Sequence, residues 1–159
     1  MKNIQLLTLL IALVFLFSGC RNEQPAVSSE VQPPVFTRTY IDTHDGYSEA
    51  VAVVFEGLKT IHVSGQVGEG SDLESQMRSA LSNLKEVLGK AGASMEDVVK
   101  MNTYIVDYGP QSLETFREVR KELLGDSDMP ASTLVGVESL ALPDWLIEIE
   151  AVAVLPVTE

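Results

Sequence analysis

The sequence of 159 residues has one cysteine, Cys20, and two histidines, His44 and His62. A single cysteine excludes a disulfide bond within the chain, and two separate histidines without cysteine support do not make a zinc pattern. Basic residues are also few: Lys and Arg number 11 against 23 Asp and Glu, no basic run occurs, and the formal net charge is −12. Since phosphate contacts need clustered Lys and Arg, we expect no nucleic acid partner.

Two catalytic patterns are missing as well. Gly65, Gly68 and Gly70 do not have the G-x-x-x-x-G-K spacing of a phosphate-binding loop, and no Ser-His-Asp arrangement has independent support. What is present is a globular composition, with 45% apolar and 21% charged residues and no internal repeat. The length suits one domain with a sizeable core.

The first residues have the order of a secretory signal. Lys2 supplies a positive charge, residues 4–17 form an apolar block, and small residues follow. The block is too short to span a bilayer comfortably. We therefore interpret residues 1–19 as a signal peptide that is removed.

The end of this segment, Phe17-Ser18-Gly19-Cys20, resembles a bacterial lipobox, in which the thiol takes a diacylglycerol. It predicts a lipid anchor on Cys20 and a place in the bacterial cell envelope, because several acyl chains on one residue anchor stably. The alternative is ordinary secretion with a spare thiol. Arg21 stands where the inner-membrane retention signal has Asp, which favours the outer membrane. We expect the polar, proline-bearing residues 20–34 to be a tether.

Hydrophobic patterns predict an α+β domain over residues 35–159. One helix is expected between a capping box at residues 71–74 and Gly92, and a second between Pro110 and Gly125. A hairpin is expected around Gly57 and a capped turn at residues 94–97. Strands are expected at residues 35–40, 50–55, 60–64, 98–106, 133–137 and 146–155. This order favours a mixed sheet with both helices on one face.

The last strand reads IEIEAVAV over residues 147–154. Its period of two puts Glu148 and Glu150 on one face and the isoleucines on the other. Two helices cover only one face of a sheet, so the glutamates share the uncovered face with Val152 and Val154. An uncovered apolar face calls for a partner, and we expect another copy of the same chain. The glutamates then either meet solvent or line a subunit interface.

Seven fragments of the domain occur in the same order in a known family. They are Tyr47-Ser48-Glu49-Ala50-Val51, Val63-Ser64-Gly65-Gln66, Asn83-Leu84, Ala91-Gly92, Asp97-Val98-Val99-Lys100, Pro130-Ala131 and Glu148-Ile149-Glu150. Together with the element order, they resemble the RidA family, also called YjgF, over essentially the whole domain.

This resemblance implies a chorismate-mutase-like fold, a homotrimer with clefts between subunits, and no metal or organic cofactor. Archetypal members hydrolyse 2-imino and enamino acids to keto acids and ammonia. That chemistry needs an arginine that holds the substrate carboxylate and a water polarised by a protein carboxylate.

The resemblance also implies roles for single residues. Glu148 stands at the water-handling glutamate, Ser64 at the serine that follows the second apolar run, and Tyr47 at the substrate-side tyrosine. Outside these positions, we expect Glu150 to be structural. Trp145 either gates a cleft or caps the core, and we favour the cap.

The chain departs from the family at the clamp for the substrate carboxylate. Ser132 stands where the deaminating members have an arginine, and Leu134 replaces a position that is often cysteine. A serine hydroxyl does not replace a buried guanidinium. Arg120, which follows Phe116 and Val119 much as a cleft-facing asparagine does in the archetypes, is our hypothesis for a substitute. The alternative is an arginine that lays its stem on apolar neighbours and keeps its head in water.

Two functions from different classes remain open at this point. The first is a hydrolytic imine or enamine deaminase of altered specificity. The second is a non-catalytic module that binds a small metabolite or a partner. Ser132 favours the second, while Glu148, Ser64 and Tyr47 favour the first.

Overall fold

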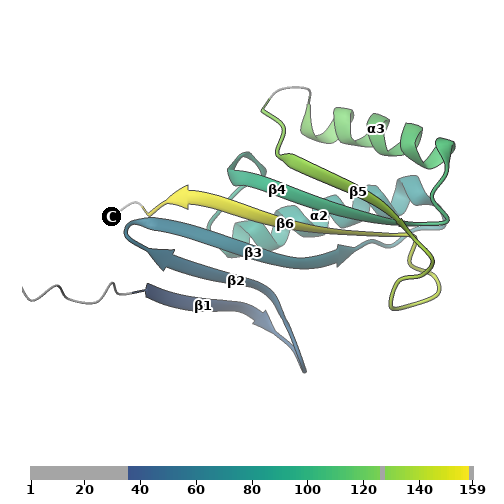
Figure 1. Cartoon of the computed structure of the whole chain (residues 1–159). Coiled ribbons are helices and arrows are strands. Elements are labelled where there is room, and N and C mark those ends of the chain that lie inside the picture. Colours follow the sequence, from purple (N-terminus) through teal and green to yellow (C-terminus); the bar gives the residue numbers. More distant parts are fainter. Residues whose placement is uncertain (1–35, 126–127, 158–159) are drawn as a thin grey trace, which may run out of the picture. The chain divides into compact units, whose positions relative to one another are not determined.

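The computed structural model describes residues 36–125 and 128–157. The predicted signal peptide, Cys20 and the tether lie outside the described residues. The described elements are β1 (Phe36–Thr43), β2 (Ser48–Phe55), β3 (Leu58–Val67), α2 (Leu73–Lys90), the 3₁₀ turn η2 (Met95–Asp97), β4 (Val98–Val106), α3 (Pro110–Leu124), β5 (Ala131–Val137) and β6 (Ile147–Pro156) (Figure 1).

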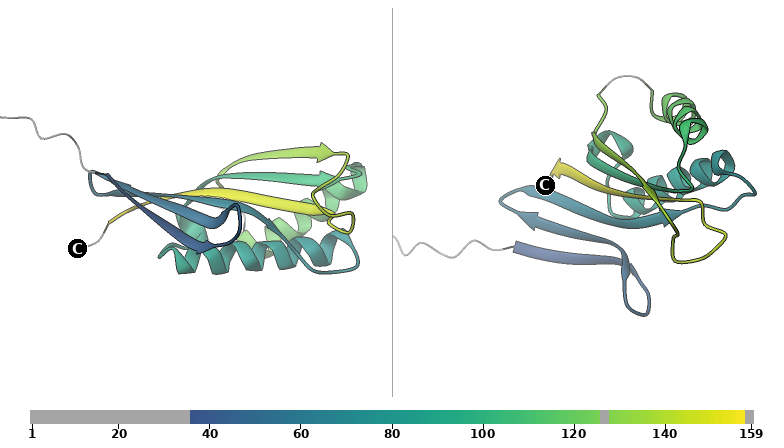
Figure 2. Two further views of the ribbon diagram at one scale, coloured as in Figure 1. Left: turned by 90° about the horizontal axis from the view of Figure 1, so that it is seen from below. Right: turned by 45° about the vertical axis from the view of Figure 1, so that its right-hand side comes forward.

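The six strands form one mixed sheet in the order β1-β2-β3-β6-β4-β5. Only β4 and β5 are parallel, and the other neighbouring pairs are antiparallel. Both helices lie on the same side of this sheet, as the left view of Figure 2 shows. The predicted fold class, a mixed sheet with two helices on one face, is confirmed. β6 sits in the middle of the sheet although it comes last in the chain.

The expected hairpin joins β2 to β3. Glu56 and Gly57 occupy its two turn positions, with φ values of 49° and 80°. Positive φ at both positions is the signature of a type I′ turn, whose twist matches that of the flanking strands.

The long helix α2 ends where the sequence predicts and begins one residue later than expected. Gly92, at φ 75°, accepts the left-handed conformation, and the Ala93 amide donates to the Leu88 carbonyl at 2.9 Å. This pattern is a Schellman stop. The expected cap on Ser71 is wrong. Asp72 is the N-cap, because its carboxylate accepts from the Ser75 amide at 2.8 Å while the Ser75 hydroxyl accepts from the Asp72 amide.

The core lies between α2 and the helix-covered face of the sheet. β6 alternates along its length as expected, with Ile147, Ile149, Ala151 and Ala153 buried and the residues between them half-buried. The α2 residues packed into this core are Met77, Ala80, Leu81, Leu84, Val87 and Leu88. The amphipathic pattern that predicted the helix is therefore the pattern that buries it.

The other face of the sheet, here called the open face, carries no helix. Register places Glu148, Glu150 and Val152 on it, because each alternates with a buried residue of β6. Directly paired residues of neighbouring strands point to the same face of a sheet, so the register also places large hydrophobic residues of other strands on the open face. They are Phe36, Tyr40, Phe55, Leu58 and Val135, all at least 40% exposed in the single chain.

Candidate functional site

Three of the predicted site residues line one hollow of about 490 Å³: Tyr47, Ser64 and Glu148. They come from the β1–β2 turn, from β3 and from β6, so the fold joins positions far apart in the chain. The other residues that line it are Glu49, Gly65, Gln66, Val67, Asn83 and Trp145. We call this hollow the Glu148 cleft.

A β-bulge in β3 shapes the cleft. Val63 pairs with Ala151 and Gln66 pairs with Ile149, so Ser64 and Gly65 together face one residue of β6, Glu150. The extra residue shifts the alternation of β3 by one position, so the Gln66 side chain lies on the helix-covered face, where it is 6% exposed. Bulges next to functional sites re-aim side chains, and this one presents Ser64 and Gly65 to the cleft.

Gly65 makes room for the Glu148 carboxylate. A Cβ atom added at Gly65 would overlap the carboxylate oxygen and carbon of Glu148. Because β3 has no side chain here, the glutamate side chain lies directly against the strand backbone. Gly65 is therefore a steric requirement for this position of Glu148.

The environment of Glu148 favours its protonated form. Partial burial raises the pKa of the Glu148 carboxyl above its ordinary value, and the negative charge of Glu150 raises it further. The residues that line the Glu148 cleft include no Lys or Arg that would offset these effects. A carboxyl whose pKa is raised is a better proton acceptor than an ordinary glutamate and can return the proton afterwards, which suits general acid–base work.

Glu150 lies beside this carboxyl and is fixed by two donors from β4. The Asn102 side-chain amide donates to Glu150 Oε1 at 2.6 Å, and the Tyr104 hydroxyl donates to the same oxygen at 3.2 Å. Burial and the charge of Glu150 raise the pKa of the Tyr104 phenol, so this hydroxyl stays a donor.

The Tyr47 side of the cleft is organised around Glu49. Glu49 Oε1 accepts from the Tyr47 hydroxyl at 3.4 Å and lies 2.9 Å from His44 Nε2, while Gln66 Nε2 donates to Oε2 at 2.9 Å. The rings of His44 and Tyr47 also pack, with their centroids 5.0 Å apart. These contacts orient a tyrosine that is otherwise 54% exposed.

The Ser64 hydroxyl is already committed as a donor. It donates to the Ser48 carbonyl at 2.6 Å, which ties β3 to the start of β2. The oxygen of Ser64 keeps acceptor capacity toward the cleft. Ser64 thus has a structural bond in addition to its place in the lining.

Ser132 and Leu134 lie on the opposite side of the sheet from Glu148. They pair with Met101 and Thr103 of β4, which are buried on the helix-covered face. β5 is also an edge strand, separated from β6 by β4. One copy of the chain therefore does not bring Ser132 or Leu134 to the Glu148 cleft.

Arg120 is also absent from the lining of the Glu148 cleft. Its Cζ atom lies 5.8 Å from the centroid of the Phe116 ring, and its Nε is buried without a hydrogen-bond partner. Within residues 36–125 and 128–157, no carboxylate lies within ion-pair distance of Arg120. The helix α3 thus holds a half-buried guanidinium with no acidic partner among the residues that the structure describes.

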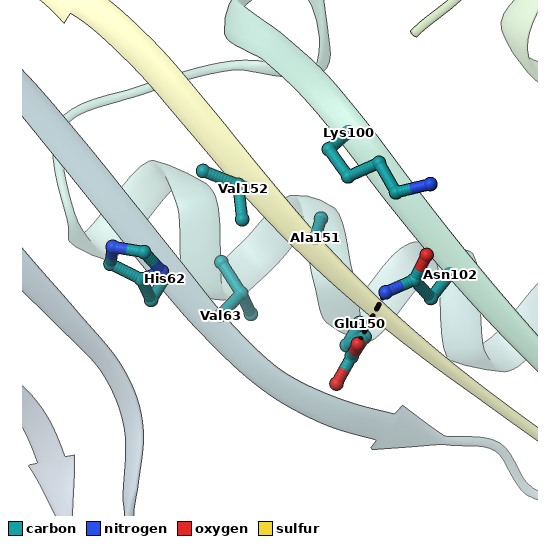
Figure 3. A pocket seen from close by; sticks show the side chains of 7 residues that line it. All are labelled: His62, Val63, Lys100, Asn102, Glu150, Ala151 and Val152. Atoms are coloured by element: carbon teal, nitrogen blue, oxygen red, sulfur yellow. Dashed lines mark hydrogen bonds between the residues drawn. The ribbon is translucent and has the colours of Figure 1, made fainter. Parts of the chain in front are cut away.

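A second, smaller hollow of about 150 Å³ lies on the open face (Figure 3). The polar groups that line it are His62, Lys100, Asn102 and Glu150. Lys100 Nζ donates to the Thr133 hydroxyl at 2.5 Å. This hollow belongs to the surface around Glu150 and lies on the same face as Glu148.

In the part of the chain that the structure describes, no three His, Cys, Asp or Glu residues are grouped to hold a metal ion. The same residues include no helix that is both long enough and apolar enough to cross a membrane.

Sequence reasoning assigned no site role to the other six residues that line the cleft: Glu49, Gly65, Gln66, Val67, Asn83 and Trp145. Trp145, which we expected to cap the core, lines the cleft. Glu49, Gln66 and Asn83 fall within the quoted family fragments, so membership of these fragments was a usable signal. Asn83 donates to the Val67 carbonyl at 2.9 Å, a contact between α2 and the end of β3 that no local pattern predicts.

Comparison with known proteins agrees with the fold. A RutC family protein of Pyrococcus abyssi is 40% identical over 91 residues, which cover 57% of this chain and 67% of that protein. The 2-iminobutanoate/2-iminopropanoate deaminase of Dermatophagoides farinae is 32% identical over 117 residues, or 69% of this chain and 85% of that protein.

Solved structures give the same result. A member of the YjgF/YER057c/UK114 family from Mycobacterium tuberculosis superposes with a TM-score of 0.64 and 33% identity, covering 75% of this chain and all of that one. A YjgF family protein from Neisseria meningitidis superposes with a TM-score of 0.66 and 26% identity, covering 77% of this chain and 98% of that one. The sequence profile described as endoribonuclease L-PSP matches residues 37–155. The chain therefore belongs to this family, which is the RidA/YjgF family that its sequence resembles.

Proposed function

We propose that the protein binds a small metabolite in the Glu148 cleft and hydrolyses an imine or enamine there. The observation that carries this proposal is the meeting of Tyr47, Ser64 and Glu148 on one hollow. A curated relative is named a 2-iminobutanoate/2-iminopropanoate deaminase, which supports the same chemistry. The raised pKa of the Glu148 carboxyl fits a group that exchanges protons with water and substrate.

In the proposed reaction, the substrate is the protonated imine, and Glu148 orients a water molecule toward its carbon and takes one of the water's protons as the carbon–oxygen bond forms. The resulting neutral carbinolamine carries both the hydroxyl and the amino group. Glu148 gives its proton to the amino nitrogen, the carbon–nitrogen bond breaks, and the departing ammonia takes the hydroxyl proton as the carbonyl forms, so that ammonium is the product. Tyr47 and Trp145 would supply the walls that hold the substrate.

The cleft is proposed to close between copies in a homotrimer. Large hydrophobic residues gather on the open face, and a contiguous apolar surface of this kind marks an interface. Ser132, Leu134 and Arg120 also lie away from Glu148 within one chain, so only a neighbouring copy can bring the two groups together.

Specificity is proposed to differ from that of 2-imino acid deaminases. Ser132 offers only a hydroxyl where those proteins hold a carboxylate with a guanidinium. Arg120 is the proposed substitute, because its half-buried guanidinium has no acidic partner among the described residues. If it faces a neighbour's cleft, it can bind an anionic group from a different backbone position.

A second candidate function is a non-catalytic ligand-binding or interaction module on the same trimer. The specific observation in its favour is Ser132, since loss of the clamp weakens binding of anionic imines. Nucleic acid is not the proposed ligand despite the family's description as an endoribonuclease, because the net charge is −12 and the cleft lining has no Lys or Arg.

The protein is further proposed to act in the bacterial cell envelope, anchored through lipid on Cys20 and in the outer membrane. The lipobox-like sequence before Cys20 and Arg21 after it support this location. Replacement of Cys20 by Ala is expected to move the protein from the membrane fraction to the soluble fraction on cell fractionation. Retention of the variant in membranes would contradict a lipid anchor on this thiol.

A coupled assay tests the activity. An amino acid oxidase generates 2-imino acids, and the protein is expected to accelerate their hydrolysis, with loss of that acceleration in Glu148→Gln. Ser132→Arg is expected to raise kcat/KM for 2-imino acids, and Arg120→Ala to lower it. If the wild type and Ser132→Arg are both inert, the deaminase proposal fails and the binding module is favoured. Unchanged turnover in Arg120→Ala removes Arg120 from the account.

A further inference from the structure

The two glutamates of the last strand face the same way at close range. Glu148 and Glu150 are separated by one residue of β6, so their side chains stand on the same face of the sheet. Like charges in such neighbouring positions oppose each other's ionisation. The cost falls on whichever carboxyl is the more buried and the less well supplied with hydrogen-bond donors.

The hydrogen bonds are unequal. Glu150 Oε1 accepts from Asn102 Nδ2 at 2.6 Å and from the Tyr104 hydroxyl at 3.2 Å, and Figure 3 shows the Asn102 contact. These two donors hold the Glu150 carboxylate in place. Glu148, in contrast, lies against the backbone at Gly65.

The other groups around Glu148 leave the charge of Glu150 uncompensated. From β4 the cross-strand neighbour is Tyr104, and from β2 and the preceding turn the cleft receives Glu49 and Tyr47. β3 and α2 contribute only uncharged groups to the lining. Lys100, the cation that shares the small hollow with Glu150, donates to the Thr133 hydroxyl on the far side of β4.

We infer that Glu150 is a positioning residue for the acid–base chemistry of the cleft: its fixed negative charge keeps the Glu148 carboxyl able to hold a proton. The raised pKa of Glu148, caused by burial and then by Glu150, agrees with this role. The catalytic role of Glu150 rests on the proposed function. The electrostatic coupling between Glu148 and Glu150 does not depend on it. It gives the repeated glutamate of IEIE a purpose other than solvation.

The coupling is measured by ¹³C NMR titration of the Glu148 side-chain carboxyl in the full chain, with the signal assigned by its loss in Glu148→Gln. Glu150→Gln removes the charge and keeps an oxygen that accepts from Asn102. The Glu148 midpoint is expected to move to lower pH by more than in Glu118→Gln, a control that removes one exposed carboxylate from α3. An equal shift in the two variants overturns the inference.

A conservative variant separates charge from shape. Glu150→Asp keeps the negative charge, so its Glu148 midpoint is expected to stay closer to that of the wild type than to that of Glu150→Gln. A midpoint as low as in Glu150→Gln would overturn a role for the charge.

The activity readout distinguishes this inference from the proposed function. In an active protein, the acid limb of the kcat/KM profile, which reports ionisation of the general base Glu148, is expected to move to lower pH in Glu150→Gln, in step with the titration. A profile that stays in place while the Glu148 midpoint moves would overturn the catalytic role of Glu150. A protein that hydrolyses no imine contradicts the proposed function, and the titration then still decides the coupling.

Discussion

Glu148 is predicted to reduce stability at neutral pH. Because its pKa is raised in the folded state, its contribution to stability is fully present below the unfolded-state pKa and is lost as the pH rises through the folded-state pKa. Glu148→Gln mimics the protonated form, so its melting temperature should exceed that of the wild type at pH 7. The gain in melting temperature should vanish in acid, where the Glu148 carboxyl is protonated in both the folded and the unfolded protein.

Thermal unfolding followed by circular dichroism at several pH values checks this. The control is Glu118→Gln, an exposed position on α3 that should show no such pH-dependent gain. A Glu148→Gln variant less stable than the wild type at pH 7 would contradict the raised pKa. The trade of stability for a functional carboxyl is common at active sites.

Gly65→Ala is predicted to disable the cleft while leaving the fold intact. The new methyl group meets the end of the Glu148 side chain, which can swing away, so we expect folding to survive. The carboxylate would then leave its position, and imine hydrolysis should fall to the level of Glu148→Gln. Gly89→Ala is the matched control, because a Cβ there meets no atom within 4 Å. Wild-type turnover in Gly65→Ala would show that the position of Glu148 is unimportant.

At the scale of single residues, the resemblance to the family identified Tyr47, Ser64 and Glu148, and all three line one cleft in the structure. Periodicity alone could place Glu148 only on a face. Trp145 lines the cleft, the less favoured of its two predicted places, because its position depends on how the loop before β6 folds. Within one chain, Arg120 and Ser132 lie outside the lining of the Glu148 cleft.

At the scale of elements, α2 should contribute more stability than its neighbour α3. Leu84 of α2 is fully buried, and Leu84→Ala is expected to lower the free energy of unfolding by about 2–5 kcal/mol through lost burial and a cavity. Leu123→Ala on α3, where the side chain is 45% exposed, should cost far less. Urea unfolding measures both, and equal losses would contradict the assignment of the core.

Element boundaries were predictable where one signal dominated. Gly92 and Gly125 follow the two helices as expected, since each has positive φ. The start of α2 was one residue off because Ser71–Glu74 and Asp72–Ser75 offer competing boxes, and hydrogen-bond geometry chooses between them. The bulge at Ser64–Gly65 was not predictable, because it appears only when β3 is paired with the last strand of the chain.

At the scale of the whole molecule, the open face is predicted to carry the subunit contacts. Phe55 lies on it and is 42% exposed, whereas the similarly exposed Leu123 lies on α3. Phe55→Glu should therefore weaken self-association, because it places a charge in an apolar interface. Leu123→Glu should leave it unchanged. Size-exclusion chromatography over a range of concentrations compares the two, and the reverse order would place the interface on the helices.

The central claim is that copies of this chain close the Glu148 cleft between them. Sedimentation velocity of residues 35–159, which lie within one compact unit, measures this most directly. The account predicts a single species with three times the mass of one copy at micromolar concentration. A species with the mass of one copy, still active in imine hydrolysis, would contradict it.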